Sequence, residues 1–513
     1  MSLPYLTEVK YPTKKYTVAF RGINYGEGTQ DGEFAETYNL STDQYPCITQ
    51  RAVRTMAGKY TLPTTLHSKG KLLVIDGADV LYGDVKVGEV TLGKKQTATI
   101  GNYIVIFPDK KYYKVPTEDD QDGTFGSMEE EYKATGLKFT ASTISKTGAN
   151  FPFREGDAVT ITGCSNSGNN KSPEIIIRSV TADVLTFDDN AFTAVENEAN
   201  EVTIARTVPD LDFICESNYR LWGTHGNTIY SSKFSDPFNF KVFDNLANDS
   251  YAIEVGSEGE FTGCIPYSSH ICFFKENTLH KLYGTKPSNF QITTVNVYGV
   301  QSGSEKSMQI VNEQLLYKGV GGVYAYTGGV PELISEKFGT KRYSEAVACC
   351  DGEKYYISMK QGETWNMFVY DVMKNIWLRE DDTQAVDMAF FDGKVYFLDA
   401  RGGLYYIDKT ADRNDIEWGA TFCTMHETMN ERKGYSKFHL RMDLSAGAWF
   451  SVDIKTDNDL QWKQIYTTHN EKAKTFSIPI IPTRCDSIDI RLRGKGKCTI
   501  KTFIREFSVG SDV

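Results

Sequence analysis

The sequence predicts an all-β protein: a β-propeller of six or seven blades with an inserted small β-barrel or sandwich domain and a C-terminal β-sandwich. Three observations lead to this prediction. Tyr (30) and Phe (29) are abundant, and both favour half-buried sheet surfaces. Pairs of apolar strands joined by a tight turn recur about every 40 residues late in the chain, which is a blade period. Long helical periodicity is missing from the chain.

The turns between the apolar strands have the composition of β-hairpin turns. Asp76-Gly77 and Asp392-Gly393 each separate two apolar runs, and Asp-Gly suits the positive φ angles of a type I′ turn. Seven copies of the pattern can be counted, and several continue into a second hairpin, as Gly321-Gly322 does before residues 323–326. Two hairpins make a four-stranded sheet, which is one propeller blade.

The pattern divides the chain into four parts. We expect an N-terminal strand and the first blades in residues 1–134, the inserted β domain in 135–207, the remaining blades in 208–412 and the sandwich in 413–513. Short strands between the second and third copies break the period and indicate the insertion. Longer strands of alternating polarity near the C-terminus predict a sandwich with one wet face. The most helix-like stretch, 127–134, is short.

Charge and cysteine usage exclude several classes of protein. The net charge of -11 and the pI near 5.3 argue against a protein that grips duplex DNA with a basic surface. The sequence contains neither a run of about 18 apolar residues nor the apolar centre of a signal peptide, so we expect no spanning helix and no secretion signal. Ten scattered cysteines without a C-x-x-C pair are expected to be free, buried thiols.

Most catalytic signatures are missing. We find no phosphate-binding loop, no nucleophile elbow and no zinc helix, so we expect no catalytic residue and no cofactor. Propellers do host glycosidases, which need two carboxylates, and Asp381-Asp382, Asp399 and Asp408 are available for such a pair. Trp222, Trp365 and Trp377 could stack on a sugar, but packing between blades is the preferred interpretation.

One stretch follows the spacing of a calcium-binding loop. Glu118, Asp120, Asp122 and Glu129 fall at positions 1, 3, 5 and 12 of that pattern, and Gly123 falls at position 6. Position 1 is Glu instead of Asp, and the preceding residues have the pattern of a strand instead of a helix. A solvated acidic linker is therefore the other interpretation.

Several segments resemble one known family. They are Arg21-Gly22-Ile23-Asn24-Tyr25 and residues 38–41, 221–223, 235–239, 322–326 and 484–486. These segments are similar to a group of tailed-bacteriophage virion proteins, the tail nozzle, tail-hub or packaged-DNA stabilisation proteins, which are β-propeller proteins. The resemblance also implies that the opening segment is the strand that introduces the propeller.

The resemblance implies a structural role without enzymatic activity. The chain would form a homo-oligomeric ring, with a hexamer favoured, at the distal end of the virion tail, after assembly in the host bacterial cytoplasm. The ring would line or close the DNA exit channel and dock portal-adaptor and other tail proteins, with the inserted domain and the sandwich as candidate contact surfaces. Viral double-stranded DNA would pass through the lumen without sequence-specific binding.

The acidic charge is compatible with such a lumen, because DNA that must slide should find few cations to bind its phosphates. Two other functions stay open. One is a glycan- or receptor-binding tail or baseplate protein, and the other is a polysaccharide-degrading propeller enzyme.

Overall fold

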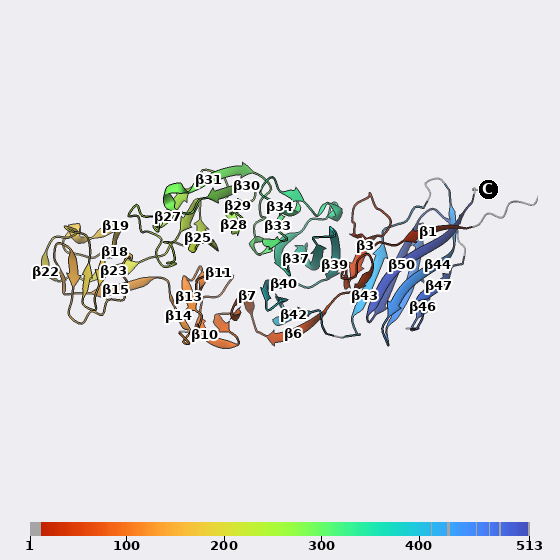
Figure 1. The fold of residues 1–513 in the computed structure, drawn as a ribbon, viewed down its shortest axis with the longest axis horizontal. Helices are drawn as coiled ribbons and strands as arrows, with labels where there is room; N and C mark the ends of the chain where they lie inside the picture. The colour runs from red at the N-terminus through yellow and green to blue at the C-terminus, as the bar shows by residue number, and fades with distance from the viewer. Residues whose placement is uncertain are drawn as a thin grey trace, which may run out of the picture. The chain divides into compact units, whose positions relative to one another are not determined.

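The computed structural model describes residues 12–118, 120–411, 413–427, 431–457, 459–470, 472–481 and 484–510. The described residues are almost all in strands, turns and loops, together with four short 3-10 helices at Ser167–Asn169, Pro287–Asn289, Glu305–Ser307 and Glu336–Phe338. None of these helices is long and apolar enough to cross a membrane. The chain folds as two compact units, one containing the residues up to Lys59 and from Lys306 onward, the other Tyr60–Glu305 (Figure 1).

Seven four-stranded antiparallel sheets in the described residues are the blades of a β-propeller, as the repeated hairpins predict. Four lie in the unit Tyr60–Glu305: β7 (Pro63–Lys69), β8 (Lys71–Asp76), β9 (Asp79–Tyr82) and β10 (Val85–Glu89); β11 (Gln96–Ile100), β12 (Tyr103–Phe107), β13 (Lys111–Lys114) and β14 (Thr124–Ser127); β24 (Phe213–Ser217), β25 (Arg220–His225), β26 (Thr228–Ser231) and β27 (Tyr251–Glu254); and β28 (Phe261–Tyr267), β29 (His270–Lys275), β30 (Thr278–Tyr283) and β31 (Gln291–Asn296).

The other three blades lie in the first unit. They are β32 (Gln309–Val311), β33 (Gln314–Gly319), β34 (Gly322–Tyr326) and β35 (Glu332–Leu333); β36 (Ser344–Cys350), β37 (Lys354–Gln361), β38 (Thr364–Asp371) and β39 (Ile376–Asp381); and β40 (Ala385–Phe391), β41 (Lys394–Asp399), β42 (Gly403–Asp408) and β6 (Val53–Lys59). The last blade therefore takes its fourth strand, β6, from the N-terminal part of the chain.

Some of the hairpin turns have the predicted type I′ geometry, but the turn at Asp76-Gly77 does not: Asp76 still pairs with Asp79 at the end of β8, and of the two expected turn residues only Gly77 (φ 63°) has positive φ. Asp392 (φ 46°) and Gly393 (φ 72°) both have positive φ between β40 and β41. Asn312 and Glu313 do the same between β32 and β33, with φ of 46° and 63°. This is the type I′ conformation, whose twist matches that of the flanking strands.

The inserted domain is a two-sheet sandwich between the second and third blades. One sheet contains β15 (Glu130–Ala134), β23 (Val202–Arg206), β18 (Ala158–Thr162) and β19 (Lys171–Ile176); the other contains β20 (Ser179–Val180), β21 (Val184–Thr186), β17 (Thr143–Ser145), β16 (Leu137–Phe139) and β22 (Val195–Glu198). The residues that looked most helical, 127–134, are the last residue of β14, two linking residues and the strand β15, which pairs with β23 along its whole length. The insertion thus starts at Glu130, five residues before the expected boundary.

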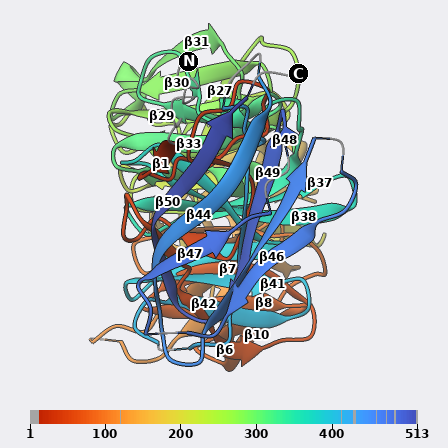
Figure 2. The same ribbon diagram turned by 90° about the vertical axis from the view of Figure 1, so that its right-hand side faces the viewer.

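The C-terminal sandwich contains strands from both ends of the sequence (Figure 2). One sheet has β4 (Leu40–Ser41), β5 (Ile48–Gln50), β50 (Cys498–Val509), β44 (Lys433–Leu444) and β47 (Thr475–Pro479), with β1 (Thr13–Thr17) on β50 and β48 (Arg484–Cys485) on β44. The other has β2 (Gly22–Ile23), β3 (Glu33–Tyr38), β43 (Glu417–Phe422), β49 (Ile488–Lys495), β45 (Trp449–Thr456) and β46 (Lys463–Thr468).

The N-terminal segment therefore completes the sandwich instead of introducing the propeller. Five of its strands complete the sandwich, and only β6 joins a blade. The reason is the burial of apolar side chains: Phe34 and Leu40 are fully enclosed in the same core as Phe450 and Leu492.

Strand β39 connects the sandwich to a blade within this unit. Side chains alternate between the two sides of a strand, so Ile376 and Leu378 enter the sandwich core while Trp377 enters the core of the neighbouring blades. Trp377 donates a hydrogen bond from Nε1 to the carbonyl oxygen of Ile334 at 2.9 Å. Gly22 of β2 lies against this strand, and a Cβ there would be 2.3 Å from the carbonyl oxygen of Trp377. The close approach requires glycine.

The Phe34→Ala substitution tests the role of the N-terminal segment. Phe34 is fully buried, so its truncation should lower the free energy of unfolding by about 3–5 kcal/mol. Calorimetry and denaturant titration should show the loss in the transition that includes the sandwich. The control is Val18→Ala in the same segment, because Val18 is 56% exposed and should change stability little. Equal effects of the two substitutions would mean that the segment does not complete the core.

Candidate functional site: a polar join in the sandwich unit

A group of buried charges lies where the N-terminal segment meets β39. Arg54 on β6 reaches two consecutive carboxylates of β39, with Nη2 at 2.7 Å from Oε2 of Glu380 and Nη1 at 2.7 Å from Oδ2 of Asp381. The same Nη1 atom donates to the hydroxyl of Thr383 at 2.7 Å. Arg51 donates from Nε to Oδ1 of Asn39 at 2.6 Å. Both arginines are therefore fixed by polar partners from distant parts of the sequence.

Electrostatic attraction keeps these groups charged despite their burial. Burial raises the pKa of Asp381, but the nearby Arg54 and Arg51 lower it more, so that the pKa lies below its usual value. For Arg54, burial lowers the pKa and the two carboxylates raise it by more, so that the guanidinium stays charged. Arg51 has its pKa lowered, first by burial and then by the repulsion of Arg54.

A second polar group lies beside the first. Lys354 on β37 is buried, donates to the hydroxyl of Ser41 at 3.0 Å and forms an ion pair with Asp43. The hydroxyl of Thr42 donates to Oδ2 of Asp371 at 2.5 Å. Three consecutive residues, the last of β4 and the two that follow it, thus bind two strands of one blade. The loop that joins the sandwich strands β4 and β5 is held against the propeller by side chains instead of by sheet pairing.

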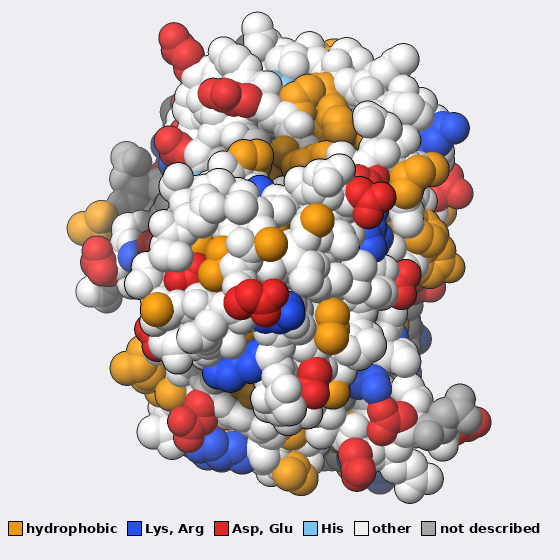
Figure 3. Space-filling model, turned by 90° about the vertical axis from the view of Figure 1, so that its left-hand side faces the viewer, with side chains coloured by type: hydrophobic (Ala, Val, Ile, Leu, Met, Phe, Trp, Pro, Cys, Tyr) orange, Lys and Arg blue, Asp and Glu red, His pale blue; other side chains and the backbone are white. Residues whose placement is uncertain are grey.

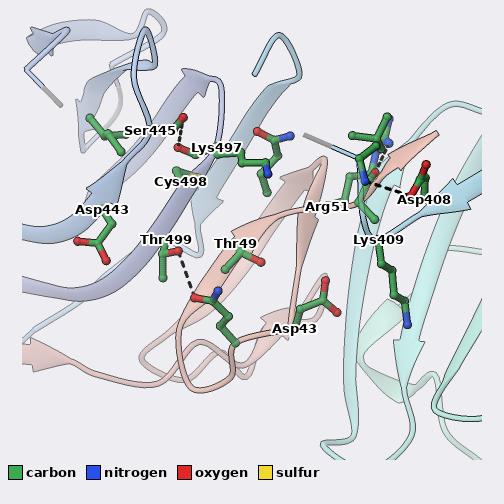
Figure 4. Close-up of a pocket in the computed structure, with 16 residues that line it drawn as sticks. Asp43, Thr49, Arg51, Asp408, Lys409, Asp443, Ser445, Lys497, Cys498 and Thr499 are labelled. Carbon is green, nitrogen blue, oxygen red and sulfur yellow. Dashed lines mark hydrogen bonds between the residues drawn. The ribbon is translucent and has the colours of Figure 1, made fainter. Parts of the chain in front are cut away.

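A polar cleft of about 660 Å³ opens next to these groups (Figure 4). Residues from β5, the ends of β42, β44 and β50 and the loops beside them line it. The labelled lining residues are Asp43, Thr49, Arg51, Asp408, Lys409, Asp443, Ser445, Lys497, Cys498 and Thr499. Its charged lining residues are three acidic ones (Asp43, Asp408 and Asp443) and three basic ones (Arg51, Lys409 and Lys497), so the cleft does not favour a strongly charged ligand of either sign.

The carboxylates of the cleft are engaged in structural contacts. Asp443 forms ion pairs with Lys474 and Lys501 at 3.1 Å and 2.5 Å. Asp408 accepts hydrogen bonds from the hydroxyl and amide of Thr410. Hydrogen bonds from Thr410 also lower the pKa of Asp408. These partners hold the carboxylates in their charged forms, whereas a general acid needs a raised pKa.

The other carboxylates considered for glycoside hydrolysis also hold the backbone or a cation. Asp399 accepts from the amides of Arg401 at 2.9 Å and Gly403 at 2.7 Å, which closes the turn between β41 and β42. Asp381 is the buried partner of Arg54. The neighbouring Asp382 is exposed. The preferred interpretation is confirmed for Trp222 and Trp377, which are 2% and 1% exposed inside apolar cores, whereas Trp365 is only partly buried.

The calcium-loop residues do not converge. Asp120 pairs with Lys114, and Glu129 pairs with Lys110 at 2.9 Å. Among the residues that the structure describes, no three His, Cys, Asp or Glu side chains gather in a way that could hold a metal ion, and Glu118, Asp120, Asp122 and Glu129 are therefore not a metal site there. The physical reason is that the second half of the pattern is strand β14, which pairs with β13 and cannot curl around an ion.

In the other unit, a comparable join attaches the inserted domain to a blade. Asp157 of the insertion is 2% exposed and accepts from Nη1 of Arg206 at 2.7 Å and from Nδ2 of Asn239 at 2.9 Å. Asn239 belongs to the long loop between β26 and β27, and its Oδ1 accepts from the amide of Ala158 at 3.2 Å. The aromatic ring of Phe238 packs 5.5 Å from the guanidinium of Arg206.

All ten cysteines are free thiols and eight are buried, which agrees with the sequence prediction. Burial raises the pKa of Cys164 to about 11 and that of Cys423 to about 12. Thiols with such pKa values are poor nucleophiles near neutral pH.

Charge is dispersed on the face drawn in Figure 3, where acidic and basic side chains alternate among neutral ones.

Sequence reasoning did not find Arg54, Glu380 or Lys354 as members of one polar group. Arg54 and its partner Glu380 are about 300 residues apart in the chain, as are Lys354 and its partner Ser41, and no local motif signals a partner at that separation. The only available signal was the acidic run at Asp381-Asp382, which was noted as a possible source of catalytic carboxylates.

No protein-family model and no curated protein sequence matches the chain. Among solved structures, BamB from Moraxella catarrhalis is similar at a TM-score of 0.35 and 12% identity, covering 71% of this chain and 100% of that one. Hsv2 from Kluyvelomyces marxianus is similar at 0.27 and 12%, covering 43% and 66%. An exo-beta-1,3-galactanase from Phanerochaete chrysosporium is similar at 0.23 and 7%, covering 72% and 100%. At these values the likenesses carry no argument about function, and the propeller assignment rests on the seven sheets of this chain.

The Arg54→Met substitution tests the buried charge group. It leaves Glu380 and Asp381 buried without their main cation and should cost about 3–5 kcal/mol of unfolding free energy at neutral pH. Its control is Arg413→Met, which removes an exposed pair with Asp415 and should have little effect.

The pH dependence follows from the direction of the pKa shift. The lowered pKa of Asp381 means that its contribution to stability is present above the ordinary value of 3.8 and is lost as the pH falls through the folded-state value. In Arg54→Met, burial without the cation raises that pKa, so the carboxyl takes up a proton at higher pH. The stability difference between the two proteins should therefore shrink as the pH is lowered. A difference independent of pH would contradict the ion pair.

The Asp157→Asn substitution tests the join of the inserted domain. Arg206 would lose its buried counterion, which we expect to destabilise the unit by about 3–5 kcal/mol. Limited proteolysis should then cut between the insertion and the blade more rapidly than in the unmodified protein. Asp189→Asn, at an exposed position of the same domain, is the control. Cleavage at the same rate in both variants would show that Asp157 does not fix the insertion.

Proposed function

We propose that the protein is a structural component of a tailed-bacteriophage tail, a nozzle or hub subunit. It assembles as a homo-oligomeric ring that lines or closes the DNA exit channel and docks neighbouring tail proteins. A hexamer is the favoured ring. The proposal assigns the protein no catalytic reaction.

The supporting observation is where the segments that resemble this virion family lie. The segment from Arg21 to Tyr25 contains β2, packs on β39 through Gly22, and places the ring of Tyr25 against Phe338. In residues 38–41, the amide of Asn39 donates to the carbonyl of Glu380 at 2.8 Å, and Ser41 accepts from Lys354. These segments are used to join one domain to another, as in a rigid assembly unit.

A third segment has the same role in the other unit. Asp236 and Asn239, within residues 235–239, are bonded to each other at 2.7 Å, and Asn239 binds Asp157 of the insertion. The segments at the joins therefore make structural contacts between domains and do not present reactive groups. This use of residues supports an architectural protein more than an enzyme.

Charge and thiols are compatible with the proposal. A net charge of -11 repels the phosphates of DNA, so a duplex could move past the protein with little counterion release. Buried free thiols suit assembly in a reducing bacterial cytoplasm. The carboxylates that a hydrolase would need are bound in turns and ion pairs, so the enzyme alternative gains no support from them.

Sedimentation and negative-stain electron microscopy of the full chain test the proposal. We expect closed rings with one dominant copy number, because heterologous interfaces that close by rotation give a defined stoichiometry. A fluorescent DNA duplex should show no affinity for the rings at about 0.15 M salt, where the Debye length is about 8 Å. A protein that stays monomeric at every concentration, or that binds the duplex tightly, would contradict the proposed function.

A further inference from the structure

The outer face of one sandwich sheet contains a hollow of about 410 Å³ that the proposed function does not use. The hollow lies on β3, β43, β49 and β45. Aromatic, charged and glycine residues share its lining, including Tyr38, Glu417, Gly419, Trp449 and Arg493. Its volume is within the range of small-molecule sites, and such sites combine apolar walls with a few polar groups.

The hollow results from a missing side chain in one cross-strand row. Gly419 of β43 pairs with Tyr38 of β3 on one side and with Arg493 of β49 on the other. Trp418 and Ala420 of β43 and Leu492 of β49 point into the core. Gly419 on β43, and Arg491 and Arg493 on β49, therefore face outward. Gly419 therefore forms a floor between two long side chains. Trp449 stands on the next strand, three strand spacings or about 14 Å from the strand of Tyr38.

A buried carboxylate holds the guanidinium groups at the hollow in place. Asp453 of β45 is only 1% exposed in its side chain and accepts from Arg491 at 2.9 Å and from Arg493 at 2.8 Å. Arg491 also stacks on Trp462, with its Cζ atom 4.4 Å from the ring centroid. The contacts to Asp453 use the Nε and Nη2 atoms of both arginines. Side chains fixed in this way lose little entropy when they bind.

We propose that this hollow is a binding site for a neutral oligosaccharide. The charged lining residues are Glu36, Glu417, Arg491 and Arg493, and both arginines are already paired with Asp453, so the site has no excess positive charge that would select an anionic ligand. The apolar face of a pyranose ring can pack on Trp449 or Tyr38 while its hydroxyls bind the carboxylates and guanidiniums. An aromatic face with paired donors and acceptors is the chemistry that a sugar ring requires. This inference does not depend on the proposed ring assembly.

The test uses the full chain on a microarray of neutral and acidic oligosaccharides, followed by calorimetric titration with the neutral sugar that binds best. Gly419→Phe should abolish binding by filling the hollow. The position accepts a side chain without strain, because a Cβ there would have no neighbour closer than 3.5 Å. Trp449→Ala should weaken binding roughly tenfold through the lost ring contact. The matched control is Gly434→Phe on the other sheet, where a Cβ meets nothing within 4 Å, and sugar binding should be unchanged.

Several results would overturn the proposal. One is the failure of every neutral sugar to bind the unmodified chain on the array and in titration at high concentration. Another is binding that survives both Gly419→Phe and Trp449→Ala. Selection of acidic over neutral sugars would contradict the charge argument. If Gly419→Phe changes the copy number of the assembly and leaves sugar binding intact, the hollow is a contact between chains, which also overturns the proposal while leaving the proposed function standing.

Discussion

The burial of the sandwich core is the constraint on which the sandwich unit depends, because that core requires both ends of the chain. Phe34 and Leu40 from the N-terminal segment enclose the same space as Phe450, Leu492 and residues of β44 and β50. Strand β6, which directly follows that segment, then completes the last blade by pairing with β42. The sandwich and the last blade can therefore reach their final form only after the whole chain is available.

Buried polar groups then specify how the parts join. Arg54 binds Glu380 and Asp381 in one unit, and Asp157 binds Arg206 and Asn239 in the other. Such pairs add less stability than apolar packing of the same volume, but a misplaced join would leave their charges buried without partners. A protein that must present fixed surfaces to neighbours gains from this selectivity, which agrees with an architectural role.

The sequence was sufficient for features with local causes and insufficient for those with distant partners. Asp392-Gly393 predicts a hairpin because positive φ at both residues is a local property, and the seven repeated copies of the strand-turn-strand pattern each fall in one of the seven blades, within the expected six or seven. The strand β15 was taken for the most helix-like stretch, since its pairing partner β23 lies about 70 residues away. The N-terminal strands were assigned to the propeller because nothing local indicates that β1 pairs with β50. The calcium spacing misled for a different reason: the second half of the pattern is β14, which is fixed by its pairing with the neighbouring strand β13.

Hydrogen exchange measured by mass spectrometry on the full chain tests the central claim most directly. If the two chain ends form one core, peptides from β3 and from β43, β49 and β50 should exchange with the same slow rate and lose protection together as denaturant is added. If peptides from β3 exchange at the rate of an unstructured segment while β49 and β50 remain protected, the C-terminal strands fold without the N-terminal segment and the account is wrong.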